Sequence, residues 1–209
     1  NALTHNHSLN ISGATAKTNY SMGLSYFNQE GIMNAANNYN RFNFRARIDQ
    51  KVTDWLDMGV NTLVSRYDTT SPDTGAYFQA FANPPVYNLY NPDNAAAYPV
   101  KYDSPQLYGF GNSYGNPFAR AQYNDSKSNG LNMVFSAYAE LKFLENKLKF
   151  KTSYNMDFQA YQARNYQPEY FVGGSQGLKN SSMSKTYGIR DKYIIDNTLT
   201  YNDSMDAHS

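Results

Sequence analysis

Apolar and polar side chains alternate along several long segments of the chain. In residues 41–52 the even positions from Phe42 to Val52 are almost all apolar, whereas the odd positions carry Arg, Asn, Asp and Lys. Residues two apart lie on the same side of a β-strand, so this period predicts a strand with one apolar and one polar face. Similar alternation predicts seven strands, near residues 5–13, 19–28, 41–52, 56–67, 131–143, 148–160 and 187–201.

The lengths of these segments and of their connections favour one class of β-protein. Soluble strands are most often about 5–6 residues long, whereas a strand that crosses a membrane needs about 9–11. Tight turns at 14–18, 53–55 and 144–147 alternate with long loops at 29–40, 68–130 and 161–186. Short periplasmic turns and long outer loops are typical of outer-membrane barrels. The pattern therefore predicts an all-β fold in which residues 1–209 form part of one antiparallel transmembrane β-barrel.

Composition supports a strand-rich, exported protein and excludes other classes. The chain is 16% aromatic and only 17% charged, against about 25% charged in an ordinary soluble domain. With 18 Lys and Arg against 17 Asp and Glu, it lacks the basic excess that nucleic-acid binding needs. It has no cysteine and no apolar run of about 18 residues, which excludes a disulfide framework and a transmembrane helix. No signal peptide opens the sequence, so we expect either a processed start or an internal piece.

Aromatic residues at the ends of the predicted strands are candidates for the membrane interface. Barrels carry girdles of aromatic side chains where the lipid meets water. Four such residues adjoin the tight turns: Tyr20, Trp55, Phe143 and Tyr201.

The long segment 68–130 is rich in Pro, Gly, Asn and Tyr. Loops this long are uncommon unless they are functional or disordered, and so many aromatic residues rarely stay unpacked, so we expect a folded outer loop. Its aromatic side chains suit stacking on a sugar or peptide, with neighbouring Asn and Asp as hydrogen-bond partners; packing within the loop, or on a partner, is the alternative. The candidate substrate-binding residues are Tyr77, Phe81, Tyr87, Tyr90, Tyr108 and Phe110.

A succession of short motifs resembles a known family. His7–Gly13 is followed by Lys17–Tyr20, Leu24–Ile32, Arg41–Arg45 and Val52–Leu56. In this order the segments resemble the early barrel of SusC-like TonB-dependent transporters. Further short motifs that resemble the same family follow in order at Pro84-Pro85, Asn116-Pro117, Leu148-Lys149-Phe150 and Asn197–Tyr201.

The resemblance implies a barrel of 22 strands, plugged by an N-terminal domain, in the outer membrane of a Gram-negative bacterium. Such transporters import nutrients, commonly an oligosaccharide or peptide, with energy from TonB, and a SusD-like surface lipoprotein commonly caps them. Within residues 1–209 we recognise no TonB box, no plug and no closing C-terminal strand, so we expect an internal fragment of the barrel. The expected partners are outer-membrane lipid, the SusD-like lipoprotein, TonB through missing N-terminal parts, and the substrate, but no nucleic acid.

Three features of the sequence could suggest metal binding, catalysis or phosphate binding, but each has a simpler structural explanation. His5 and His7 share a strand face but lack a third ligand nearby in sequence. Glu140 and Asp157 would have to lie about 5–9 Å apart to act as a glycosidase pair, and a polar lining explains them more simply. The segment 173–177 resembles a phosphate loop but has no Lys-Ser/Thr pair. We therefore predict no enzyme, no catalytic residue, no metal and no cofactor.

Two alternatives remain open from the sequence. One is a soluble or surface-anchored β-sandwich that binds glycans. The other is a passive porin or adhesin barrel, which would lack an upstream plug.

Overall fold

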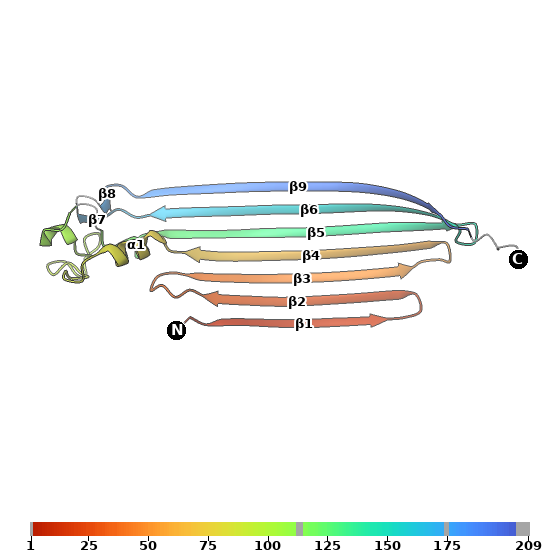
Figure 1. Cartoon of the computed structure of the whole chain (residues 1–209), viewed down its shortest axis with the longest axis horizontal. Helices are drawn as coiled ribbons and strands as arrows, with labels where there is room; N and C mark the ends of the chain where they lie inside the picture. Colours follow the sequence, from red (N-terminus) through yellow and green to blue (C-terminus); the bar gives the residue numbers. More distant parts are fainter. Residues whose placement is uncertain (1, 112–114, 174–175, 204–209) are drawn as a thin grey trace, which may run out of the picture.

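Seven strands form a single antiparallel sheet. The computed structural model describes residues 2–111, 115–173 and 176–203, and the order of strands in the sheet is β1-β2-β3-β4-β5-β6-β9 (Figure 1). Neighbours in the sheet are therefore neighbours along the chain, apart from the short hairpin β7–β8 inserted before β9. The strands of the sheet are β1 (Thr4–Ala14), β2 (Thr18–Glu30), β3 (Asn38–Lys51), β4 (Leu56–Ser71), β5 (Asp125–Phe143), β6 (Leu148–Gln167) and β9 (Ser182–Tyr201). The predicted fold class, an all-β antiparallel sheet of seven long strands, is confirmed.

The two ends of the sheet differ. Three short turns join the strands at one end, and all long connections lie at the other, together with α1 (Gly75–Ala82), the 3-10 helix η1 (Pro105–Tyr108), α2 (Pro117–Gln122), β7 (Tyr170–Gly173) and β8 (Gln176–Leu178) (Figure 1). Among the described residues, no helix is long and apolar enough to cross a membrane. We call these ends the short-turn end and the loop end.

The register places apolar residues on one face across the whole sheet. One row of paired positions runs through all seven strands and contains Ile11, Met22, Ala46, Thr62, Phe135, Met156 and Tyr193. The neighbouring row on the other face contains Asn10, Gly23, Arg45, Leu63, Val134, Asp157 and Lys192. A shift of one residue in any strand would exchange its two faces, so the alternation fixes the register.

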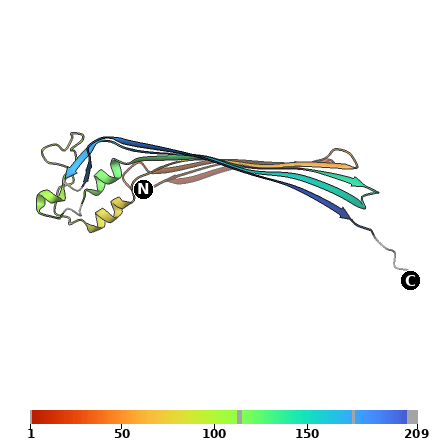
Figure 2. The ribbon, with the colours of Figure 1, turned by 90° about the horizontal axis from the view of Figure 1, so that it is seen from above.

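Neither face of the sheet is covered by a second layer in the described residues, and the sheet is one twisted layer when seen from above (Figure 2). Side chains of the apolar face are consequently exposed, including Leu24 at 42% and Ile195 at 61%. A β-sandwich would bury this face against a second sheet. The arrangement is that of a barrel wall, and the β-sandwich alternative is not supported.

The strands extend farther toward the loop end than the alternation predicted, four of them by four residues or more. β4 ends at Ser71, β5 begins at Asp125, β6 ends at Gln167 and β9 begins at Ser182. The predicted loops 29–40, 68–130 and 161–186 therefore shorten to 31–37, 72–124 and 168–181. Both faces are polar in these extensions, as in Ser126–Asn129, so the period of two disappears while backbone pairing continues.

Four tyrosines each lie over a glycine directly opposite on the adjacent strand. The pairs are Gly13–Tyr20, Gly59–Tyr138, Gly130–Tyr67 and Gly188–Tyr161. A Cβ atom on any of these glycines would lie 2.0–2.5 Å from a tyrosine atom. The glycines therefore provide space for the rings, which cover the backbone that lacks a side chain.

Gly59→Ala is expected to destabilise the sheet. The new Cβ would lie 2.3 Å from Cε1 of Tyr138, whose hydroxyl donates a hydrogen bond to Asp49 Oδ1 (2.9 Å). Overpacking of this kind costs about 1–3 kcal/mol. The measurement is the thermal midpoint of the folded protein in detergent, with Gly111→Ala as control because nothing lies within 4 Å of that position. Equal midpoints for the two variants would contradict the prediction.

Candidate functional site

The long connection 72–124 folds at the loop end and packs on the segment 168–181. Its small core consists of Tyr102, Ala119 and Val172, with Phe118, Tyr123 and Tyr170 packed against it. Val172 and Tyr170 come from the β7–β8 hairpin, and the backbone N–H of Phe171 donates to the carbonyl of Pro99 (3.2 Å). Two distant loops thus form one folded unit, which we call the loop platform.

Asn116 is the fully buried centre of the loop platform. Its side-chain oxygen accepts hydrogen bonds from the N–H groups of Phe118 (3.0 Å) and Ala119 (3.2 Å), so it caps α2, and Pro117 provides a favourable first helical residue. Its Nδ2 donates to the carbonyls of Leu89 (2.9 Å) and Asp103 (3.1 Å). The side chain therefore ties α2 to two other stretches of the loop.

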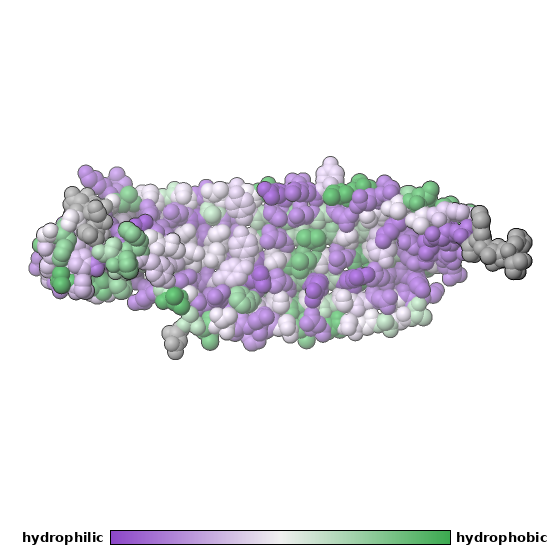
Figure 3. Space-filling view, viewed as in Figure 1, coloured by the Kyte–Doolittle hydropathy of each residue, from purple (hydrophilic) through white to green (hydrophobic). Residues whose placement is uncertain are grey.

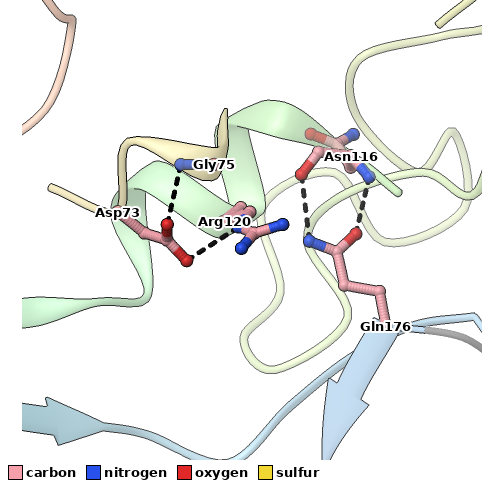
Figure 4. A network of polar contacts seen from close by, with 5 residues as sticks. All are labelled: Asp73, Gly75, Asn116, Arg120 and Gln176. Carbon is pink, nitrogen blue, oxygen red and sulfur yellow. Dashed lines mark hydrogen bonds and ion pairs between the residues drawn. The ribbon is translucent and has the colours of Figure 1, made fainter. Parts of the chain in front are cut away.

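Gln176 pairs with the backbone of Asn116 and so attaches the β7–β8 hairpin. Its Oε1 accepts from the Asn116 N–H (2.6 Å) and its Nε2 donates to the Asn116 carbonyl (3.1 Å), as Figure 4 shows. Sixty positions separate the two residues along the chain. This contact joins the β7–β8 hairpin to the long connection 72–124 within the loop platform.

Asp73 joins the two helices of the loop platform. One carboxylate oxygen accepts from the N–H of Gly75 (2.8 Å) at the start of α1, and the other accepts from Nε of Arg120 in α2 (2.7 Å) (Figure 4). A groove of about 170 Å³ lies beside them, lined by apolar residues including Tyr77, Ala80 and Phe118. The groove could accept a small apolar side chain of a ligand or partner.

A buried carboxylate orders a second part of the loop platform. Asp103 accepts from the Ser104 N–H (2.8 Å) and from the hydroxyl of Tyr108 (2.8 Å). The hydrogen bond to Asp103 raises the pKa of Tyr108, and partial burial raises it further. Tyr108 therefore stays a neutral donor and remains directed at Asp103 rather than at solvent.

Tyrosine rings fill the interior of the loop platform. Tyr102 stacks on Tyr90 with centroids 5.6 Å apart and meets the edge of Tyr123 at 5.4 Å. Lys101 Nζ lies 5.5 Å from the rings of both Tyr90 and Tyr102. Burial, and then the neighbouring tyrosines, raise the pKa of Tyr102 to about 12.

The loop platform is expected to open in strong alkali. Because the pKa of Tyr102 is higher in the folded state (about 12) than in an unfolded chain (about 10), neutral Tyr102 stabilises the fold below about pH 10, and this stabilisation is lost as the pH rises toward 12. Tyrosinate absorbance should show a late-titrating phenol, and hydrogen exchange in the loop should accelerate over the same range. Tyr102→Phe should remove the late phenol and move loop opening to higher pH. Titration of Tyr102 at pH 10 in the folded protein would contradict the prediction.

The structure does not bring all six candidate binding residues together. Tyr87 and Tyr108 are neighbours, with centroids 6.2 Å apart, and Tyr90 stacks within the tyrosine cluster. Tyr77 lines the groove between α1 and α2, whereas Phe81 is 92% exposed. Phe110 is half-buried near η1. Tyr114, another aromatic residue of this loop, lies outside the described residues.

The sequence pattern did not predict the structural roles of several residues that organise the loop. Asn116, Asp103 and Gln176 are buried polar groups whose partners are distant in sequence. Asn116-Pro117 and Ser104-Pro105 do carry a local signal, because a capping residue followed by proline is typical of a helix start. That signal predicts α2 and η1 but not their tertiary partners.

The four candidate interface aromatics all lie at the short-turn end. Tyr20 and Tyr201 are close to the ends of β2 and β9, Phe143 ends β5, and Trp55 precedes β4. All four are exposed. Their position matches an aromatic girdle, and contact with lipid remains a prediction.

The polar face of the sheet carries paired and unpaired charges. Arg47 Nε bonds Asp49 Oδ2 (2.7 Å), and Lys151 lies 4.6 Å from the ring centre of Tyr138. Arg41 and Arg45 line a hollow of about 490 Å³ over β1–β4, and neither has an ion pair within the described residues. This face can hold an anionic group or a complementary part of another protein segment.

Among the described residues, those considered for metal binding or catalysis are too far apart or too few to form a site. His5 and His7 have ring centroids 5.2 Å apart, but no group of three potential ligands occurs in the described part of the chain. Glu140 pairs with Lys151, six residues from Asp157 on β6, so the two carboxylates lie about 20 Å apart along the strands. They therefore cannot form a glycosidase pair. In the segment 173–177, Gly174 and Ser175 lie outside the described residues.

Comparison with curated proteins finds TonB-dependent receptors. No protein-family model matches the chain. TonB-dependent receptor P3 of Formosa agariphila is 24% identical over 214 aligned residues, covering 98% of this chain and 20% of the receptor. TonB-dependent receptor P26 of the same organism is 28% identical, covering 75% of this chain and 15% of the receptor. The chain thus spans about a fifth of the length of these relatives or less.

Solved structures with a similar fold include the RagAB peptide importer. Its 'open-open' state aligns with a TM-score of 0.75 and 19% identity over 98% of this chain, and its 'closed-closed' state with 0.72 and 18% over 97%. The chain covers 22% of each of those chains. Likeness at this identity shows a shared fold. In sequence and fold, the chain is similar to a section of the β-barrel of SusC-like TonB-dependent transporters, and the resemblance drawn from its motifs is confirmed.

Proposed function

We propose that this chain forms part of the barrel wall and outer loops of a transporter that imports a nutrient, a peptide or an oligosaccharide, across the outer membrane. The uncovered apolar face of the sheet carries the proposal. On β5 its apolar band runs from Leu131 to Phe143, and on β4 from Leu56 to Val64. At about 3.3 Å per residue and a tilt near 40° these bands rise about 20–30 Å, close to the roughly 25 Å apolar band of an outer-membrane barrel.

Backbone pairing supports the same placement. Unpaired backbone N–H and C=O groups cannot lie in hydrocarbon, so only helices and closed barrels span a membrane. The inner strands β2–β6 are paired on both sides over nearly their full length. In a complete barrel, further strands would pair with the outer edges of β1 and β9.

The loop platform is the proposed site for substrate and for a surface lipoprotein of the SusD-like type. Its surface includes large exposed apolar side chains, and hydrophobic patches are visible there in Figure 3; the residues include Phe78 (71%), Phe81 (92%) and Leu107 (76%). Exposed apolar patches of this kind mark interaction surfaces. Energy coupling to TonB would depend on parts of the protein other than this chain.

Fractionation of the complete polypeptide tests the proposal. We expect it in the outer membrane, extracted only by detergent, together with a surface lipoprotein. Cells that express it should take up a labelled oligopeptide or oligosaccharide, and uptake should fall when Phe78 and Phe81 are changed to Ser if the loop platform contacts the lipoprotein. A polypeptide that remains in the soluble fraction would contradict the proposal and favour a binding domain.

A further inference from the structure

The apolar face of the sheet ends in a hollow toward the loop end. A groove of about 340 Å³ crosses β4, β5, β6 and β9, where Leu131, Ala160 and Ile189 form its apolar part. Arg66, Gln162 and Tyr187 form its polar part. The groove stays open because Ala160, between Leu131 and Ile189, carries only a methyl group, and Gly130 and Gly188 contribute backbone alone to its wall. The groove therefore joins an apolar strip to hydrogen-bond donors on one continuous surface.

Positive charge accumulates beside the groove on the same face. Lys127, Arg164 and Lys185 lie in one paired row across β5, β6 and β9. With Arg66 they make four cations, and two acidic residues, Asp68 and Asp125, lie among them on this face. Asp191 is on the same face but lies six residues farther from the loop end than Lys185. We call the four cations together with Asp68 and Asp125 the basic outer patch. Its formal charge is 4 − 2 = +2.

The acidic residues of the patch neutralise its cations unequally. Asp125 pairs with Arg164 and lies 3.5 Å from Lys127 Nζ. The Asp68 carboxylate lies 3.6 Å from Arg66 Nε, and both side chains are more than half exposed, so this pair is weak. Lys185 has no ion pair within the described residues. Arg66 and Lys185 thus remain available to an anionic ligand.

The height of the patch determines which anion it meets. Arg66 lies ten residues above Leu56, the first residue of β4, which is a rise of about 25 Å for a strand tilted near 40°. This rise equals the apolar thickness of the bilayer, so Arg66 lies where acyl chains give way to headgroups. The patch faces away from the polar side of the sheet, and hence away from the route of a substrate.

We infer that the groove and the basic outer patch bind a phosphate-bearing lipid of the outer leaflet, with its acyl part against Leu131, Ala160 and Ile189 and its phosphorylated headgroup spanning the distance of about 20 Å from Arg66 to Lys185. Arginine suits phosphate because its planar guanidinium can donate two parallel hydrogen bonds. The inference rests on the membrane placement proposed above.

The test uses the complete polypeptide, purified from outer membranes in detergent and stripped of lipid. Native mass spectrometry measures binding of lipid A and of its dephosphorylated form. Each Lys or Arg near an anionic lipid surface contributes about 1 kcal/mol, so the double variant Arg66→Gln/Lys185→Gln should bind phosphorylated lipid about 30-fold more weakly. The matched control, Arg190→Gln/Lys192→Gln, removes two charges from the opposite face of β9 and should bind as the unchanged protein does.

Each outcome decides the inference. Loss confined to the first double variant, and to the phosphorylated lipid, supports it. Equal binding by both double variants, equal binding of both lipids, or displacement of the lipid by inorganic phosphate at the same concentration would overturn it. Absence of the polypeptide from the membrane fraction would instead overturn the proposed function, so the two failures are distinguishable.

Discussion

Phe135→Arg is expected to prevent assembly of the protein in the outer membrane. Phe135 lies on the apolar face, two residues from the middle of the Leu131–Phe143 band, in a row that is apolar or nearly so on all seven strands. An arginine near the bilayer midplane of a barrel costs about 2–4 kcal/mol, and less toward the interfaces. The measurement is the amount of folded protein in outer membranes, read from the mobility of unheated samples in detergent gels.

The adjacent residue provides the control. Ser136→Arg introduces the same side chain one position farther along β5, on the polar face, where Ser136 hydrogen-bonds Asn155 (2.7 Å). This variant should assemble, and Met133→Arg, nearer the end of the band, should show an intermediate defect. If Phe135→Arg and Ser136→Arg assemble equally well, the apolar face does not contact lipid.

Asn116→Ala is expected to unfold the loop platform while the sheet stays intact. The substitution removes the cap of α2, worth about 1 kcal/mol, and leaves the buried carbonyl of Asp103 without its donor, at about 1–3 kcal/mol, whereas the carbonyl of Leu89 still accepts from the N–H of Asp103 (3.3 Å). A local loss of roughly 2–4 kcal/mol should accelerate amide hydrogen exchange in 101–111, 115–124 and 170–173 by a factor of about 30 or more. Exchange in β3 and β4 should not change.

Two further variants distinguish the role of Asn116 from a general effect of substitution. Asn116→Asp keeps the oxygen that caps α2 but sets a carboxylate against two carbonyl oxygens, so it should also open the platform. Asn94→Ala changes an exposed asparagine of the same loop and should have no effect on exchange. Equal exchange in Asn116→Ala and Asn94→Ala would show that the buried hydrogen bonds do not hold the platform together.

The strands could be predicted from the sequence because the alternation of apolar and polar residues that marks each strand lies within the strand itself. Alternation such as Arg41–Val52 needs no knowledge of distant residues, and the register then follows from matching apolar faces. The strand ends were predicted too short, as at Asp125 and Gln167, because pairing continues where both faces meet water and the period is lost.

The loop platform was less predictable because its order depends on non-local pairs. Asn116 and Gln176 hydrogen-bond across sixty positions, and nothing near either residue indicates the partner. The candidate binding aromatics were chosen by residue type, and the structure divides them between an exposed helix end at Phe81 and the stacked cluster of Tyr90. Which of them touches substrate remains a prediction.

The polar extensions of β5, β6 and β9 determine how far the loop platform lies from the apolar band of the sheet. On β6 the apolar face ends at Ala160, whereas the strand continues to Gln167, a further rise of about 17 Å at the same tilt. In the proposed membrane placement, these paired strands are a rigid extension that holds the loop platform about 17 Å beyond the apolar band.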